Sequence, residues 1–187
     1  LPMIIFGVIF RFYKQKNIQG IGNIFLGIGF FFLGIGYMKD GFEDLKQGID
    51  LAQFAVDGYK GIIIYAFVGM IVTVIIQSSA ATLALTITAL STGQLIYLDA
   101  LAIAVGANIG TATTAAMGAM VSNANSKRMA LGLFIFKGIV GFITLVLLYF
   151  IMDIIDYISN ILDISADNWG MKLAVFHTFF NLVGLII

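Results

Sequence analysis

Residues 61–90 read GIIIYAFVGMIVTVIIQSSAATLALTITAL and contain no charged side chain. A helix that crosses the hydrocarbon core of a bilayer, about 30 Å thick, needs about 20 residues. The run is therefore too long for one crossing and too short for two full crossings joined by a turn. We predict a re-entrant helical hairpin, which enters the membrane, turns near mid-depth and returns to the side from which it came.

The composition of the whole chain is that of a membrane protein. Of its 187 residues, 60% are hydrophobic and 11% are charged, against about 45–50% and about 25% in an average soluble domain. Ten basic residues balance ten acidic ones, which gives no support to nucleic-acid binding. The lack of cysteine and the single histidine, His177, argue against a disulfide framework and a Cys- or His-built metal site.

Clusters of charged residues separate the other apolar stretches, and together they predict an all-α polytopic membrane protein. One helix is expected in each of residues 18–38, 98–121, 129–152 and 173–187. We expect a single membrane domain over residues 1–187. In it, residues 1–17 are the end of a preceding helix and a basic loop, 18–121 form a repeat unit, and 122–187 form two further helices. The chain is expected to be an excerpt of a longer protein.

Basic residues gather in two loops, and such loops are typical of the cytoplasmic side. An even number of crossings must then separate the two loops. Residues 18–38 and 98–121 supply two crossings, provided that residues 61–90 return to their own side. The loop after residue 152 is then predicted to lie outside. The loop residues are Arg11, Lys14 and Lys16 in the first, and Lys127 and Arg128 in the second.

Two further patterns concern helix packing. Apolar residues between 42 and 56 recur at steps of three and four, which favours a helix on the outer membrane surface or one packed against its neighbours. Two series of glycines repeat every seven residues and lie on nearly opposite faces of one helix, which predicts close neighbours on both faces. The apolar series is Phe42, Leu45, Ile49, Ala52 and Val56; the glycines are Gly20, Gly27, Gly34 and Gly41, and Gly22, Gly29 and Gly36.

Two polar islands interrupt the apolar spans. Residues 77–82 (QSSAAT) lie at the expected hairpin tip, and residues 106–111 (GANIGT) lie in the middle of the 98–121 span. Two glycines beside Asn108 predict a broken helix. Broken helices in a membrane offer N–H groups to anions and carbonyl oxygens to cations. In the alternative interpretation, the hydroxyls bond to carbonyls of the previous turn and the amides join helices.

The same residues resemble a known family. QSSAAT at 77–82 resembles the Gln-Ser-Ser-Ser motif of type II sodium/phosphate cotransporters, and residues 106–111 are similar to their Gly-Ala-Asn-Ile-Gly-Thr motif. Residues 127–130 and 176–181 are similar to flanking elements. Ala80 departs from the motif, because the family usually has a third serine there. The resemblance implies one half of an inverted-repeat transporter, similar to the second repeat. The complementary repeat would come from another part of the chain or from a second copy.

The resemblance implies sodium-coupled symport of inorganic phosphate by alternating access in the plasma membrane or the bacterial inner membrane. It implies sodium as the co-transported ion, no organic cofactor and no enzymatic activity. Phosphate is expected at Ser78, Ser79 and Thr111. Sodium is expected at Gln77, Thr82, Asn108 and Thr113.

Four other polar residues are weaker candidates for the site. Thr114 follows the second island. His177 and Asn181 are four residues apart on one helix face, which suits helix packing as well as a site. Lys137 is expected to extend toward the cytoplasmic surface near Arg128, with a transport role as the alternative.

Three other functions stay open at this stage. The first is transport of another oxyanion, such as sulfate or a carboxylate, and the second is a membrane sensor or scaffold that transports nothing. The third is an intramembrane hydrolase with Ser79 as nucleophile and His177 as base. The sequence around Ser79 lacks the Gly-x-Ser-x-Gly context of many serine hydrolases.

Overall fold

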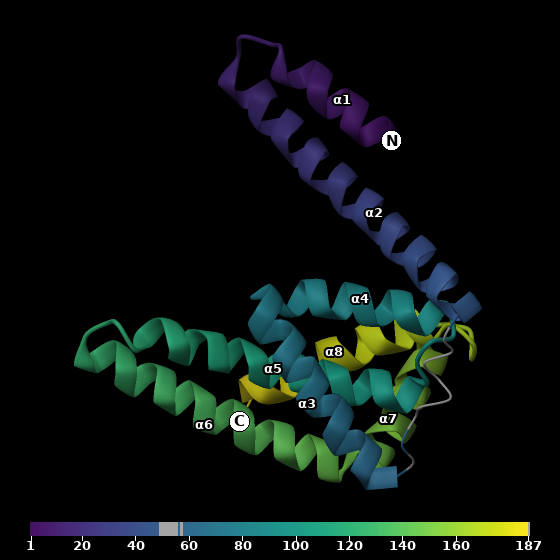
Figure 1. Ribbon diagram of the computed structural model, residues 1–187, viewed down its shortest axis with the longest axis vertical. Coiled ribbons are helices and arrows are strands. Elements are labelled where there is room, and N and C mark those ends of the chain that lie inside the picture. Colours follow the sequence, from purple (N-terminus) through teal and green to yellow (C-terminus); the bar gives the residue numbers. More distant parts are fainter. Residues whose placement is uncertain (49–55, 57, 187) are drawn as a thin grey trace. The chain divides into compact units, whose positions relative to one another are not determined.

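The computed structural model describes residues 1–48, 56 and 58–186. All regular structure in these residues is helical, as the sequence predicts (Figure 1). The contacts divide the chain into two compact units, Leu1–Gln47 and Gly48–Ile187. The single membrane domain stays a prediction.

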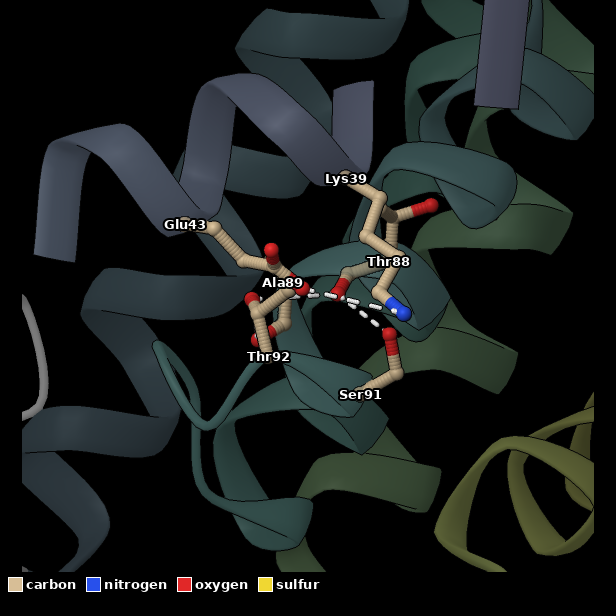
Figure 2. A network of polar contacts seen from close by, with 6 residues as sticks. All are labelled: Lys39, Glu43, Thr88, Ala89, Ser91 and Thr92. Carbon is tan, nitrogen blue, oxygen red and sulfur yellow. Dashed lines mark hydrogen bonds and ion pairs between the residues drawn. The ribbon is translucent and has the colours of Figure 1, made fainter. Parts of the chain in front are cut away.

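The first unit pairs α1 (Pro2–Arg11) with α2 (Lys16–Gly48), and α2 contains the predicted 18–38 span. Glycines let the two backbones approach: a Cβ on Gly22 would lie 2.9 Å from the carbonyl oxygen of Gly7, and one on Gly29 would lie 2.5 Å from Ile4 Cγ1. Lys39 and Glu43 form an exposed ion pair along α2, at 3.7 Å (Figure 2).

The two glycine faces of α2 differ. Among the described residues, no atom lies within 4 Å of a Cβ built on Gly20, Gly27, Gly34 or Gly41. The second series is packed as predicted at Gly22 and Gly29, but among the described residues no atom lies within 4 Å of a Cβ on Gly36. A neighbour for the other face stays a prediction. The predicted surface helix extends over residues 49–55, which lie outside the described residues, so it also stays a prediction.

The second unit is built around one central helix. Its helices are α3 (Gly58–Ile76), α4 (Ser79–Ser91), α5 (Tyr97–Ala119), α6 (Ala124–Val146), α7 (Leu148–Ile161) and α8 (Trp169–Ile186). Helix α5 contacts α3, α4, α6 and α8, and its residues from Asp99 to Asn108 are buried. The other helices surround it (Figure 1).

Small residues hold α3 and α5 together. A Cβ on Gly106 would lie 1.8 Å from the carbonyl oxygen of Ala66, and one on Gly69 would lie 2.2 Å from that of Ile103. Such approach is possible only without side chains at these positions. It gives the helices close van der Waals contact where lipid supplies no hydrophobic driving force between them.

The predicted break in the 98–121 span is wrong in this structure. Helix α5 is continuous from Tyr97 to Ala119. Gly106 and Gly110 serve instead as contact points for α3, since a Cβ on Gly110 would lie 2.8 Å from the carbonyl oxygen of Met70. The glycines are used here for their small size and not for their backbone freedom.

Helices α3 and α4 meet at Gln77 and Ser78, where the sequence places the hairpin tip. Helix α4 has 13 residues, or roughly 20 Å at 1.5 Å per residue. It is too short to cross a bilayer, whereas α3 is long and apolar enough to do so. The re-entrant path of the pair stays a prediction.

Beyond residue 122 the structure has three helices where the sequence predicts two. The apolar run 129–152 is interrupted at Leu147, whose φ of −94° and ψ of 12° end α6. The residues after Leu147 then begin α7 instead of extending α6.

The chain is a membrane protein by the length and polarity of its helices. Among the described residues, four helices are long and apolar enough to span a membrane: Lys16–Asp44, Gly58–Ile76, Tyr97–Ala119 and Ala124–Val146. Large apolar side chains on the outer helices are exposed, among them Ile75 at 75% and Phe142 at 68%. Lipid is the environment in which such surfaces are stable.

The re-entrant hairpin predicts the sides on which three positions lie. Single cysteines at Asn17 and Ser126 should react with a membrane-impermeant maleimide from the cytoplasmic side, and one at Ala166 should react from outside. This chain contains no cysteine of its own. Labelling of Asn17 and Ser126 from opposite sides would mean that α3 and α4 together cross the membrane an odd number of times.

Candidate functional site

The hairpin tip has an unusual backbone. Gln77 has a φ of 58°, in the left-handed region, and its N–H donates to the carbonyl oxygen of Thr73 at 2.7 Å. Ser78 is extended, and its Oγ accepts from the N–H of Ala81 at 3.2 Å, which makes it the N-cap of α4. Non-glycine residues in the left-handed region are strained and gather at functional sites.

The N-terminus of α4 offers donors to an anion. The first N–H groups of an α-helix have no partner within the helix, and the helix dipole places positive charge there. Ser78 accepts from one of them, the N–H of Ala81. The N–H groups of Ser79 and Ala80 are left to bond beyond the helix. Ser79 is half-buried at the first helical position.

Thr73 joins the two polar islands, and the sequence analysis did not identify it. Its hydroxyl donates to Thr82 Oγ1 at 2.9 Å, and Thr82 donates to the carbonyl oxygen of Ser78 at 3.1 Å. Thr73 Cβ also lies 2.8 Å from the place of a Cβ on Gly110. Thr73 and Thr82 are each 1% exposed. One feature of the sequence could have identified it: Thr73 is the one polar residue between Tyr65 and Gln77.

Asn108 faces a different side of α5. It lies two residues before Gly110, which corresponds to roughly 200° around the helix. Its Nδ2 donates to Asn181 Oδ1 on α8 at 3.1 Å, and Asn181 Nδ2 donates to the carbonyl oxygen of His177 at 2.8 Å and lies 3.1 Å from His177 Nε2. The structure therefore brings together Asn108, Asn181 and His177, and separates them from the α3 side.

Lys137 of α6 belongs to the same network. Its ammonium donates to Asn108 Oδ1. The expectation that Lys137 extends toward the cytoplasmic surface is therefore wrong, because the side chain turns to the central helix instead. A cavity of about 240 Å³ borders this network and is lined by Phe136, Lys137, Val140, Phe180, Asn181, Gly184 and Leu185.

The α5 threonines bond within their own helix. Thr111 donates to the carbonyl oxygen of Ala107 at 3.1 Å, Thr113 to that of Ile109 at 3.1 Å, and Thr114 to that of Thr111 at 2.8 Å. These are the bonds to the previous turn that the sequence offered as the alternative to an ion-binding role. Each hydroxyl oxygen still has lone pairs for a cation, so a role in ion binding stays a prediction.

Hydroxyls also line the C-terminal part of α4. Ser91 donates to the carbonyl oxygen of Thr88 at 2.8 Å, and Thr92 donates to that of Ala89 at 3.0 Å (Figure 2). Both carbonyl oxygens also accept a backbone N–H, from Thr92 at 3.1 Å and from Gln94 at 2.9 Å respectively. The hydroxyls therefore add second bonds at the end of this helix.

A helical hairpin whose polar tip packs against a central span, with further polar groups in that span, is the arrangement of a membrane transport protein. The family model described as Na+/Pi-cotransporter matches residues 50–162. The chain belongs to this family.

Two relatives carry the name "Putative inorganic phosphate export protein YjbB". The protein of Salmonella typhimurium (strain LT2) is 32% identical over 122 residues, which are 65% of this chain and 21% of that protein. The protein of Escherichia coli (strain K12) is 30% identical over 126 residues, 67% of this chain and 22% of that protein. The chain thus spans about a fifth of their length. No solved structure matches it.

Proposed function

We propose that the chain is one half of a sodium-coupled symporter of inorganic phosphate in the plasma membrane or the bacterial inner membrane. The observation that carries the proposal is the junction at Thr73, because it holds the hairpin tip against α5 at Gly110. The match to the Na+/Pi-cotransporter family supports phosphate and sodium as the transported ions.

Phosphate binds at the start of α4 in this proposal. The N–H groups of Ser79 and Ala80 and the hydroxyls of Ser78 and Ser79 donate to its oxygens. The Thr111 hydroxyl joins them when it turns away from the carbonyl oxygen of Ala107, to which it donates in this structure. Ser78 accepts from Ala81, and its own hydroxyl hydrogen can still donate to an anion. A helix N-terminus with added hydroxyls suits an anion because it needs no fixed positive side chain.

Oxygen ligands for cations lie around the same junction. Sodium is held there by the amide oxygen of Gln77 and the hydroxyl oxygens of Thr82 and Thr113. Asn108 is a further cation ligand on a different side of α5, where it contacts α6 and α8. Thr82 accepts from Thr73 and donates to Ser78, which leaves one lone pair for a cation.

The complementary repeat completes the transport pathway. It comes from another part of a longer chain or from a second copy of this one. Movement of one repeat against the other around a shared site then gives alternating access. The two relatives are named for phosphate export, so net export of phosphate is the second candidate function. The sodium and phosphate gradients decide in which direction a symporter carries its substrate.

The test is transport of ³²P-phosphate in proteoliposomes that contain the complete transporter, with the complementary repeat present. We expect uptake with an inward sodium gradient, loss of most uptake when choline replaces sodium, and efflux from phosphate-loaded vesicles when the gradient is reversed. Competition by sulfate equal to that by phosphate would identify a general oxyanion transporter. A well-folded complete transporter without any flux, in the presence of the complementary repeat, would favour a sensor or scaffold.

A further inference from the structure

Lys137 is a charged residue in the middle of a span. It is the one charged side chain between Met129 and Val146, and it is half-buried. The nearer end of α6 lies about 14 Å away at 1.5 Å per residue, which is longer than a lysine side chain. Ionisable residues at this depth are costly and mark functional sites.

The charge of Lys137 is matched with an amide and not with a carboxylate. Its ammonium donates to Asn108 Oδ1. In the part of the chain that the structure describes, the ion pairs are Lys39–Glu43 and Lys172–Asp156. An amide oxygen is a neutral ligand, so the network at Lys137 keeps a net positive charge.

Asn108 is held so that its oxygen faces the ammonium. Its Nδ2 donates to Asn181 Oδ1, and Asn181 is fixed in turn by the carbonyl oxygen of His177. This chain of bonds orients the amide of Asn108, which is 4% exposed. The sequence analysis expected sodium at Asn108, and in the structure the amide oxygen of this residue accepts from an ammonium.

We propose that the Lys137 ammonium is a tethered cation that takes the place of a sodium ion at Asn108. This inference rests on the proposed function and deepens it. The ammonium occupies the oxygen of Asn108 that a free sodium ion would otherwise bind. A cavity of about 240 Å³ lies beside Lys137 and Asn181. Sodium then binds elsewhere, at the hairpin tip.

The direct test is the number of bound sodium ions. In Lys137→Met the oxygen of Asn108 loses its ammonium and can accept a free ion. Equilibrium dialysis of the purified protein with ²²Na⁺ should find one more sodium ion per copy in this variant than in the wild type. Lys127→Met, which removes a basic residue of the loop region, should bind the same number as the wild type.

Phosphate transport gives a second readout. We expect phosphate uptake by K137M to depend more steeply on the sodium concentration than uptake by the wild type, because one more free sodium ion then binds per copy. Methylammonium should return Lys137→Ala toward the wild-type sodium dependence, because it can occupy the same oxygen. Lys137→Gln serves if K137M does not purify as a folded protein.

Three outcomes would overturn the inference. The first is wild-type sodium binding in K137M and K137Q. The second is an unchanged sodium dependence of phosphate uptake in these variants. The third is a loss of uptake that neither sodium nor methylammonium restores, which would make Lys137 a packing residue. If the wild-type protein carries no phosphate, the proposed function fails, and the count of sodium ions still decides the role of Lys137.

Discussion

Replacement of Gly106 by alanine is expected to prevent assembly of the second unit. A Cβ at this position would lie 1.8 Å from the carbonyl oxygen of Ala66 and 2.6 Å from its carbon. These atoms belong to the α3 backbone, so no side chain can rotate to make room. Separating α3 from α5 would open the central contact of the unit. The cost is expected to be about 3 kcal/mol or more, at the upper end of overpacking effects.

The measurement is the yield of monodisperse protein after detergent extraction, together with its thermal unfolding midpoint. Gly118→Ala is the matched control on the same helix, because no described atom lies within 4 Å of a Cβ there. The control should be neutral or slightly stabilising, since alanine is the better helix former. A G106A protein with the yield and midpoint of G118A would show that α3 and α5 are not in close contact.

The second large effect is expected from Ser79→Ala. If phosphate binds at the start of α4, this change removes one donor to a buried anion. Loss of such a partner costs about 1–3 kcal/mol, or roughly 5- to 150-fold in affinity. The helix itself should remain, because its N-cap bond is made by Ser78 and not by Ser79. The apparent phosphate affinity of uptake into proteoliposomes measures the effect.

Ala80→Ser is the matched control at the next position. It introduces the residue that the cotransporter motif usually has there, and we expect it to be tolerated. Thermal stability of both variants separates a binding effect from a folding effect. A stable S79A protein with wild-type phosphate affinity would remove the start of α4 from the site.

The sequence by itself determined the class of protein and the place of the hairpin tip. Uncharged runs long enough to cross a membrane can be recognised from composition alone. The run 61–90 has the length of a hairpin, and its polar residues at 77–82 mark the place of the turn. The structure has its turn at Gln77 and Ser78. The two motifs likewise identified the family without knowledge of their surroundings, because a motif is a local property of the chain.

Tertiary structure decided how the second island is used. A glycine in a helix can break it or let a neighbour approach, and only the neighbour determines which. At Gly106 the neighbour is the backbone of α3, so α5 stays continuous.

The partners of the polar side chains were also decided by the fold. Thr73 and Thr82 are nine residues apart and meet because α3 and α4 turn at Gln77. Lys137 and Asn108 are 29 residues apart on different helices. Helical periodicity tells which residues share a face of one helix, but the contact between two faces depends on how the helices pack. The pairing of an ammonium with the amide of Asn108 therefore came from the packing of α6 against α5.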